Sequence, residues 1–430
     1  MKEKIKIGLV GYGIVGNGVI KIINSNRAAL EKRVGARIDI AAVCDIRRIR
    51  VKGAKYYKRY KDLIARRDID IIVELVGGYE PARTLILEAL NAGKHVVTAN
   101  KAVLAKYWDE IFSAAHQNGC LTYFEAAVGA GIPVIEGLNE GLAANKINKI
   151  VGILNGTTNY ILSEMTKKGV SFNTALDHAR KAGFAEADPS FDIDGIDTAH
   201  KLAVLASLAY SSWIKLEDIS VSGIKQVSAD DVKFAKEEFD YVIKLLGYAI
   251  AGKNGMELSV EPCMISGDDN FANVDGENNA ILFSGDATGD VIFYGKGAGQ
   301  LPAASAVVSD IIFLARQIAN GTAGQVPYVT YDPGKHPNII PEDNTQSRYY
   351  LKFTTLDKPG VLSRISGILG KHGVSIASVY QKPPIKKRRK GVPIIMITHK
   401  TKYGNLAKAM SEIDKLSMAM SKSVKYKIFE

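Results

Sequence analysis

Short apolar runs alternate with longer amphipathic stretches through the first third of the chain. Apolar runs at residues 5–10, 38–43, 69–76 and 94–99 end at glycine or polar residues, which is typical of buried strands. Helical spacing follows at residues 17–23, after Pro81 and at 104–118. Strands that alternate with helices predict an α/β domain built on a doubly wound, parallel sheet.

The first strand runs directly into a G-x-G-x-x-G turn at residues 11–16. Glycines at this point allow a tight turn and a close approach of the backbone to a pyrophosphate, which the N-terminus of the following helix then binds. The motif alone is weak, but its place between a strand and a helix predicts a dinucleotide site. The predicted contact residues are Gly11, Gly13, Ile14, Val15 and Gly16.

The second strand ends at Asp45, which is followed by Arg47 and Arg48. An acidic residue at this position binds the ribose 2′-hydroxyl of NAD, whereas arginine accommodates the 2′-phosphate of NADP. The two signals conflict and leave the preference open. We expect a protein that accepts both cofactors.

The strand at 94–99 carries Thr98, Asn100 and Lys101 at its carboxyl end. Ligands of doubly wound sheets bind beyond the carboxyl ends of the strands. We therefore expect these residues to face cofactor and substrate, with a solvated loop lysine as the alternative for Lys101.

Three glycine-rich or polar turns follow. Glu125 precedes the turn 126–133, which suits either an oxygen-liganded cation or a tight turn with a helix start at Pro133. Residues 155–160 read either as turn and helix-cap chemistry or as donors for an amino-acid substrate. Residues 293–299 form a second strand-to-helix turn, which we expect beside the nucleotide, and a helix from Pro302 to about Ile318 follows.

An acidic segment, 186–197, precedes a helical pattern that begins near Gly195. Asp197 and Lys201 are four residues apart and face the same side of that helix. The apolar run 202–206 buries the helix, and a buried lysine stays charged only beside a carboxylate. Such a lysine can donate and accept a proton. A solvated loop followed by an ordinary ion pair is the alternative.

The last eighty residues form a separate pattern after a linker at 332–347 that is rich in proline and polar residues. The order is strand 349–355, helix 360–372, strand 375–381, strand 392–399, helix 405–416 and strand 423–429. This βαββαβ order predicts a small α+β module at 348–430.

Composition narrows the class of protein. The chain has 430 residues, a formal net charge of +11 and three widely spaced cysteines without a metal-ligand pattern. Basic residues are spread out apart from the run 386–390, which we interpret as a solvated hairpin tip. We expect anionic substrates rather than nucleic acid, no apolar run long enough to cross a membrane, and a cytoplasmic location.

Six of these stretches resemble homoserine dehydrogenases in order and spacing. They are 11–16, 98–101, 125–133, 154–160, 186–201 and 295–299, and the resemblance covers about residues 5–320. It implies reversible, NAD(P)-dependent interconversion of L-homoserine and L-aspartate 4-semialdehyde, in the pathway to threonine and methionine. It also implies a Rossmann-type domain at 1–130, completed by about 300–320, and an α+β catalytic and oligomerisation domain at 131–331.

The resemblance assigns roles to individual residues. Lys201 is the proton-transfer residue, Asp197 orients it, and Lys101 lies between the nicotinamide and the reacting carbon. Substrate contacts fall on Glu186, Asp192, Thr157 and Lys101. Cofactor contacts add Asp45, Arg47, Arg48, Thr98, Asn100 and Gly297 to the G-x-G-x-x-G residues. A sodium or potassium ion is expected at Glu125, Val128, Ala130 and Ile132.

The C-terminal module resembles the ACT domain, which commonly binds amino acids. The resemblance rests on residues 356–362 and 373–376, and it implies an effector site near Asp357, Gly360, Val361 and Leu362. We expect threonine as the effector and a homo-oligomer, dimer or tetramer, paired partly through this module. An amino-acid sensor that only binds is the non-enzyme alternative, and aspartate-semialdehyde dehydrogenase, which needs a thiol nucleophile, is the enzyme alternative.

Overall fold

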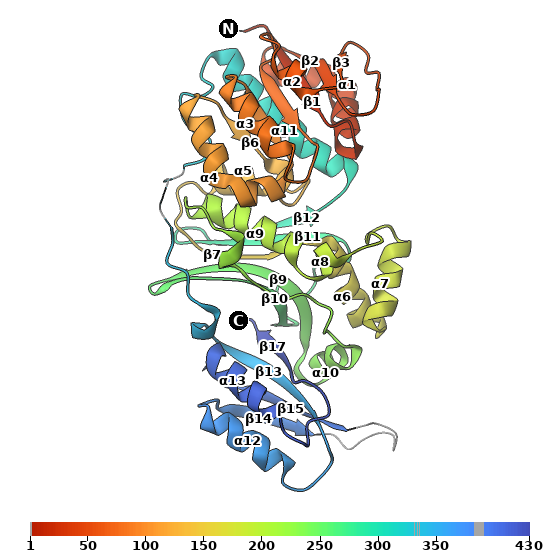
Figure 1. Ribbon diagram of the computed structural model, residues 1–430, viewed down its shortest axis with the longest axis vertical. Coiled ribbons are helices and arrows are strands. Elements are labelled where there is room, and N and C mark those ends of the chain that lie inside the picture. The colour runs from red at the N-terminus through yellow and green to blue at the C-terminus, as the bar shows by residue number, and fades with distance from the viewer. Residues whose placement is uncertain (1, 331, 333, 335, 382–390) are drawn as a thin grey trace. The chain divides into compact units, whose positions relative to one another are not determined.

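The computed structural model describes residues 2–330, 332, 334, 336–381 and 391–430 (Figure 1). The chain divides into two compact units, and each is described by itself. The first contains Met1–Gly156, Asp197–Ile219 and Glu277–Pro337. The second contains Thr157–Ile196, Ser220–Gly276 and Asn338–Glu430.

The first unit is built on the predicted parallel sheet. Six strands lie in the order β3-β2-β1-β4-β5-β6, and every neighbouring pair is parallel. The strand order reverses between β1 and β4, which is where such sheets bind ligands. The bounds are β1 Lys4–Val10, β2 Arg37–Cys44, β3 Lys55–Tyr57, β4 Ile71–Glu74, β5 His95–Thr98 and β6 Thr122–Tyr123.

The helices of this sheet are α1 Ile14–Val34, α2 Tyr60–Ile64, α3 Ala82–Asn91, α4 Lys101–Gln117 and α11 Gln300–Asn320. The first helix is longer than the predicted 17–23, because α1 begins at Ile14 and continues to Val34. Its last turns contain alanine, leucine, glutamate, lysine and arginine, which favour a helix, and Gly35 ends it with a φ of 77°. The short β3 was also not predicted.

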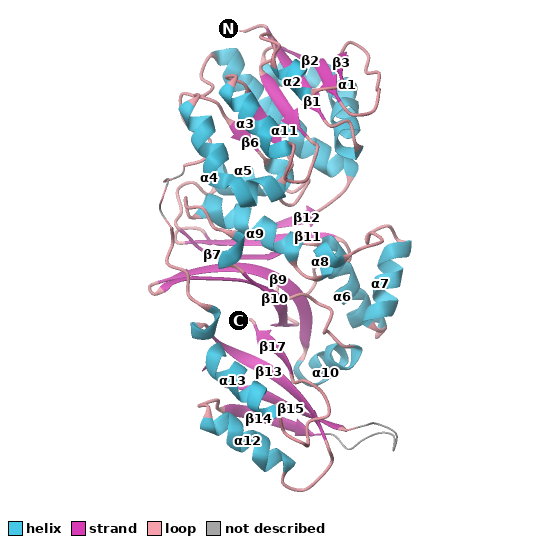
Figure 2. Ribbon diagram, in the orientation of Figure 1, coloured by secondary structure: helices cyan, strands magenta, loops and turns pink. Residues whose placement is uncertain are grey.

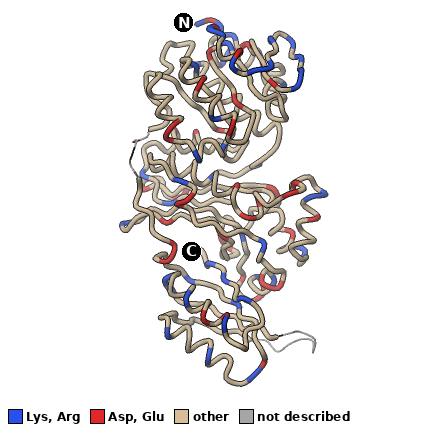
Figure 3. Tube along the Cα trace, in the orientation of Figure 1, with Lys and Arg blue, Asp and Glu red and all other residues tan. Residues whose placement is uncertain are grey.

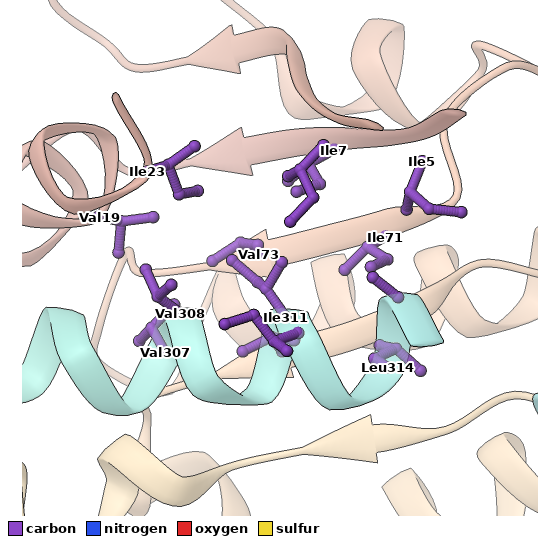
Figure 4. Packing of buried hydrophobic residues seen from close by; sticks show 14 of the residues in the cluster. Ile5, Ile7, Val19, Ile23, Ile71, Val73, Val307, Val308, Ile311 and Leu314 are labelled. Atoms are coloured by element: carbon purple, nitrogen blue, oxygen red, sulfur yellow. The ribbon is translucent and has the colours of Figure 1, made fainter. Parts of the chain in front are cut away.

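Helix α11 completes the core of this sheet, although it lies far away in sequence. Its apolar face packs with α1 against β1 and β4 (Figure 4). The residues that meet there are Ile5, Ile7, Val19, Ile23, Ile71, Val73, Val307, Val308, Ile311 and Leu314. Burial of such side chains contributes about 1.5–3 kcal/mol each.

Among the described residues, α11 is the one helix long and apolar enough to cross a membrane by length and composition. The prediction that no apolar run reaches this length is wrong by that measure, although Ser305, Ser309, Asp310, Arg316 and Gln317 interrupt the apolar residues of this helix. The packing against β1 and β4 gives the apolar residues of α11 their role in the core.

The first unit also contains an antiparallel sheet of β7 Ile147–Ile153, β11 Asn278–Gly285 and β12 Gly289–Lys296 (Figure 2). The predicted helix after Gly195 is confirmed as α9 Ile196–Ala209. Short elements complete the unit: η1 Glu125–Ala127, α5 Val134–Glu136, η2 Gly137–Gly141 and η3 Leu216–Asp218.

The second unit contains α6 Gly156–Lys168, α7 Phe172–Lys181, α8 Ser190–Ile193, β8 Ser220–Val221 and α10 Ala229–Phe239. Two long antiparallel strands follow, β9 Tyr241–Gly252 and β10 Gly255–Ser266. The strand β10 also pairs in parallel with β8 and with the last strand of the chain.

The predicted βαββαβ module is confirmed within the second unit. Its elements are η4 Glu342–Asn344, β13 Gln346–Thr355, α12 Val361–Lys371, β14 Ile376–Gln381, β15 Val392–Thr398, β16 Thr401–Lys402, α13 Tyr403–Ile413 and β17 Val424–Ile428. Its sheet runs β17-β13-β15-β14 and packs on α12 and α13. The basic run 386–390 and Pro333 of the predicted linker lie outside the described residues.

Charge is dispersed over both units. Acidic and basic residues are interspersed along the trace of each unit (Figure 3). A denser basic stretch occurs in the loop between β2 and β3, which contains Arg47, Arg48, Arg50 and Lys52.

Candidate active site

The turn after β1 is shaped by its glycines. Gly11 has a φ of 96°, and a Cβ there would lie 2.5 Å from the carbonyl oxygen of Leu75. A Cβ at Gly16 would lie 2.3 Å from the carbonyl oxygen of Gly11. Gly13 has open space around its Cα, and α1 begins at the next residue. The turn therefore leaves room for a phosphate group at the helix N-terminus.

Asp45 and Arg47, which gave conflicting predictions, bind each other. The Asp45 carboxylate accepts the Tyr12 N–H at 2.8 Å and the Arg47 Nε–H at 3.0 Å. Arg47 also donates to the Tyr12 carbonyl oxygen at 2.9 Å. The side-chain hydrogen bond from Arg47 lowers the pKa of Asp45 to about 2. Arg48, the neighbouring candidate, is exposed.

A cavity of about 620 Å³ lies beside this pair. It extends from the glycine turn to the segment that follows β3, and basic side chains dominate its charged groups. Its lining includes Gly11, Gly13, Asp45, Arg47, Lys58, Arg59, Tyr60, Lys61, Val76 and Pro81. Such a cavity suits the nucleotide end of a dinucleotide.

Thr98 and Asn100 shape the carboxyl edge of the sheet. The Thr98 hydroxyl donates to the buried carboxylate of Glu74 at 2.5 Å. Asn100 donates to the Gly78 carbonyl oxygen at 2.8 Å, and its own side-chain oxygen caps α4. Burial raises the pKa of Glu74 despite the hydrogen bond from Thr98. These contacts fix the position of Lys101, the first residue of α4.

Lys101, Asp197 and Lys201 form one charged cluster. Lys201 Nζ lies 2.7 Å from Asp197 Oδ2, and Lys101 Nζ lies 3.2 Å from Asp197 Oδ1. Asp197 is 4% exposed. Burial opposes ionisation of Asp197, but Lys201, Lys101 and the hydrogen bonds from Lys201 and Asn155 outweigh it and hold its pKa well below the usual range. The carboxylate is therefore a fixed negative charge between two lysines.

Backbone and amide groups complete the position of Lys201. Lys201 Nζ donates to the Leu154 carbonyl oxygen at 2.6 Å, and Asn279 donates to the same oxygen at 2.9 Å. Asn155 donates to Asp197 Oδ2 at 2.8 Å. Asn155 belongs to the turn 155–160, for which donors to a substrate were one of two interpretations, whereas Asn279 was not among the predicted site residues.

Gly297 contacts this cluster through Asn279. A Cβ at Gly297 would lie 2.1 Å from the Asn279 side chain, so only glycine leaves space for it. The same turn reaches the glycine loop of β1, because Gln300 donates to the Ile14 carbonyl oxygen at 2.9 Å. The predicted proximity of this turn to the nucleotide motif agrees with that contact.

The remaining substrate candidates belong to the second unit. Glu186 is exposed, Asp192 is partly buried in α8, and the Thr157 hydroxyl donates to the Phe184 carbonyl oxygen at 2.7 Å. Asp192 precedes Asp197 by five residues in the chain.

The turn that contains Glu125 agrees with one alternative of its prediction, the tight turn with a helix start at Pro133. The Glu125 carboxylate accepts the N–H groups of Ile135 and Glu136 at 2.9 and 2.8 Å, at the start of α5. Its own N–H donates to the buried Asp310 at 2.9 Å. Burial raises the pKa of Glu125 to about 7. Val128, Ala130 and Ile132 are buried in this turn, and Ala130 has a φ of 47°.

In the C-terminal module, Gly360 caps α12 with a φ of 88°. Val361 is buried, whereas Leu362 is 40% exposed, and Asp357 lies in the exposed loop before them.

Comparison with known proteins gives three matching family models. A homoserine dehydrogenase model matches residues 133–312, the NAD-binding domain model of the same family matches 11–125, and an ACT domain model matches 349–417.

Individual relatives match over most of their length. A homoserine dehydrogenase of Neisseria gonorrhoeae is 41% identical, with 96% of each chain covered. The structure of one from Thiobacillus denitrificans has a TM-score of 0.93 and 40% identity over 100% of this chain and 99% of that one. A hyperthermophilic archaeal homoserine dehydrogenase solved in complex with NADPH has a TM-score of 0.60 and 27% identity, covering 72% of this chain and 97% of that one. With the geometry described above, these matches show that the chain belongs to the homoserine dehydrogenase family.

Proposed function

We propose that this NAD(P)-binding oxidoreductase reduces L-aspartate 4-semialdehyde to L-homoserine with Lys201 as the proton donor. The observation that supports this role is the cluster of Lys101, Asp197 and Lys201. An ammonium group has three N–H donors. Asp197 and the Leu154 carbonyl oxygen orient two of those of Lys201, so one remains for a substrate oxygen.

NAD(P)H, held by the glycine turn and the cavity beside Arg47, would supply the hydride. As the aldehyde carbon accepts it, Lys201 donates a proton to the developing alkoxide, and in the reverse direction neutral Lys201 accepts the hydroxyl proton. Asp197 stabilises the ionised lysine and holds its orientation. Lys101 balances the carboxylate, is partly exposed, and begins α4 just beyond the carboxyl end of β5, where we expect the cofactor.

Substrate recognition follows from the charges of an amino acid. Its ammonium group needs an anion, and we assign Glu186 and Asp192 to that role. The Thr157 hydroxyl, which donates to the Phe184 carbonyl oxygen close to Glu186, is assigned as a further substrate contact. The direct test is the loss of reduced-nicotinamide absorbance with L-aspartate 4-semialdehyde. Folded protein without turnover would favour the amino-acid sensor.

We propose a preference for NADPH, with NADH also accepted. Arg47 already occupies the Asp45 carboxylate, which would otherwise accept a ribose hydroxyl. Lys58, Arg59 and Lys61 line the same cavity, and they favour the extra phosphate of NADPH. The archaeal relative solved with NADPH supports this assignment. A higher kcat/KM with NADH than with NADPH would contradict it.

We propose a sodium or potassium ion at Glu125, Val128, Ala130 and Ile132. Two buried carboxyl groups of this turn favour such an ion. Burial and the neighbouring Glu136 raise the pKa of Glu125, and burial and Glu125 raise the pKa of Asp310. A monovalent cation held by oxygen ligands would stabilise the ionised form of Glu125 and the turn itself, whose Ile132 lies beside Gly295. Replacing NaCl with N-methylglucamine chloride at constant ionic strength should lower both the melting temperature and kcat.

We propose that the ACT domain binds threonine near Asp357, Gly360, Val361 and Leu362 and that the protein forms a homo-oligomer in the cytoplasm. In the described sheet β14 is the last strand, and its Val379 is exposed, which suits pairing with a second copy.

The three cysteines are free and buried, as in reducing compartments. Activity unchanged by excess threonine would contradict the effector, and a monomeric mass by light scattering would contradict the oligomer.

A further inference from the structure

The loop that contains Asp192 rests on a short segment from another part of the chain. We call residues 221–225 the support segment. The Ile224 N–H donates to the Ile193 carbonyl oxygen at 2.8 Å. Lys225 Nζ lies 2.7 Å from Asp194 Oδ1. The two residues after Asp192 are therefore bound by two neighbouring residues of the support segment.

Gly223 allows the closest of these approaches. A Cβ on Gly223 would lie 2.2 Å from the Ile193 carbonyl oxygen and 2.6 Å from the Asp194 Cα. These atoms are backbone, so a larger residue cannot be accommodated by a side-chain rotation. Any substitution must move the loop away from the support segment.

The support segment is itself fixed to the core of the second unit. Val221 pairs with Val260 of β10, and the Ser222 N–H donates to the Val260 carbonyl oxygen at 2.7 Å. Gly195, which ends the loop with a φ of 84°, packs against the side chains of Val260 and Val221. The support segment and the end of the loop that contains Asp192 therefore both pack on the buried strand β10.

The strand β10 is held in turn by the ACT domain. Lys427 of β17 pairs with Glu257 and donates to the Tyr248 hydroxyl, and Lys425 pairs with Glu261. Most of these groups are buried, so β10 is a rigid base for the support segment.

We propose that Gly223, Ile224 and Lys225 are positioning residues for substrate binding, because they fix the backbone that presents Asp192. The inference rests on the proposed contact between Asp192 and the substrate. It predicts that a displaced loop weakens binding of the amino-acid substrate. The described contacts of Gly223, Ile224 and Lys225 do not involve the cluster of Lys101, Asp197 and Lys201 or the cofactor cavity. We therefore expect the cluster and the cavity to keep their function.

The test uses steady-state kinetics of the full-length protein with L-aspartate 4-semialdehyde and NADPH. Gly223→Ala should raise the KM for the semialdehyde about tenfold, with kcat and the KM for NADPH within twofold of the wild type. Lys225→Met should raise the same KM about threefold, because its pair is partly exposed and screened. Circular dichroism and the melting temperature establish that each variant is folded.

Matched controls separate the support segment from general effects. Gly252→Ala adds a methyl group where the nearest contact is an ordinary 3.7 Å, and Lys233→Met removes an exposed ion pair on α10. Both should keep the wild-type KM. Lys225→Met remains informative if Gly223→Ala does not fold.

The outcomes also separate this inference from the proposed function. Folded Gly223→Ala and Lys225→Met with a wild-type KM for the semialdehyde would overturn the inference, and a raised KM in Asp192→Asn would still support the substrate role of Asp192. A raised KM in the support-segment variants with an unchanged KM in Asp192→Asn would overturn the route through Asp192.

Discussion

Lys201 and Lys244 are both buried lysines, but their partners differ. Lys201 on α9 pairs with a carboxylate at 2.7 Å and shares it with Lys101. Lys244 on β9 donates to the Val274 carbonyl oxygen at 2.5 Å and to Asn159 at 3.2 Å, and its carboxylate partner Asp275 is 3.7 Å away. Burial lowers the pKa of Lys244 to about 8, and Asp275 only partly opposes this.

The difference teaches that burial and a displaced pKa do not by themselves identify a proton-transfer residue. Perturbed pKa values also occur at structural sites. Lys244 fastens the loop at 274–276 to Asn159, which itself donates to the Val274 and Gly276 carbonyl oxygens. Lys201 instead shares its carboxylate with Lys101, which begins α4 beyond the carboxyl end of β5, and this arrangement supports the proposed proton transfer.

Of the substitutions at the two lysines, Lys201→Met should have the largest effect on catalysis. We expect kcat to fall by about 10²–10⁴-fold, the range for loss of a general acid. Asp197 keeps Lys101 and Asn155 as partners, so the fold should persist. NADPH oxidation and near-ultraviolet circular dichroism measure the two quantities, and a kcat within tenfold of the wild type would remove Lys201 from the mechanism.

Lys101→Met should have a smaller effect, about 10–100-fold in kcat, because Lys201 still neutralises Asp197. A part of the loss should appear in the KM for NADPH, since Lys101 lies at the cofactor edge. The double variant with Lys201→Met should lose less than the product of the single effects, because both lysines act on one carboxylate. Additive effects would show that the two lysines act independently.

Lys244→Met should leave kcat within about twofold of the wild type and change the pH dependence of stability instead. The pKa of Lys244 is lower in the folded state than in the unfolded state, so the unfolded state binds more protons between about pH 8 and 10.5. The wild type should therefore gain on the order of 3 kcal/mol of unfolding free energy relative to the variant over this range. Denaturant unfolding at pH 7.5 and 10.5 measures the difference, and parallel curves for both proteins would refute it.

Local patterns in the sequence were sufficient for the elements that depend on neighbouring residues. The glycine turn after β1 and the Asp197 and Lys201 pair follow from strand-turn-helix order and from the four-residue repeat of a helix. The βαββαβ module was also predictable, because its turn residues and apolar runs lie within eighty residues.

Contacts between distant residues were not predictable in this way. Asn279 meets the Leu154 carbonyl oxygen across 125 residues, and Gly297 is needed only because Asn279 is there. The ion pair between Asp45 and Arg47 was not predicted either, because each residue was considered alone and each alone suggests a different cofactor. The long strands β9 and β10 went unpredicted, because a run buried on both faces lacks the alternation that identifies a strand.

The pairing of β17 with β10 and β13 has a consequence for synthesis and handling of the protein. Until β17 has been synthesised, β10 and β13 each keep an unpaired edge, and such edges template aggregation. Chains that lose the segment after Ser423 would therefore be substrates for chaperones and proteases rather than partly active enzymes. For expression, an affinity tag belongs at the N-terminal end, away from the hydrogen bond between the Phe429 N–H and the Met264 carbonyl oxygen, which extends the pairing of β17 with β10.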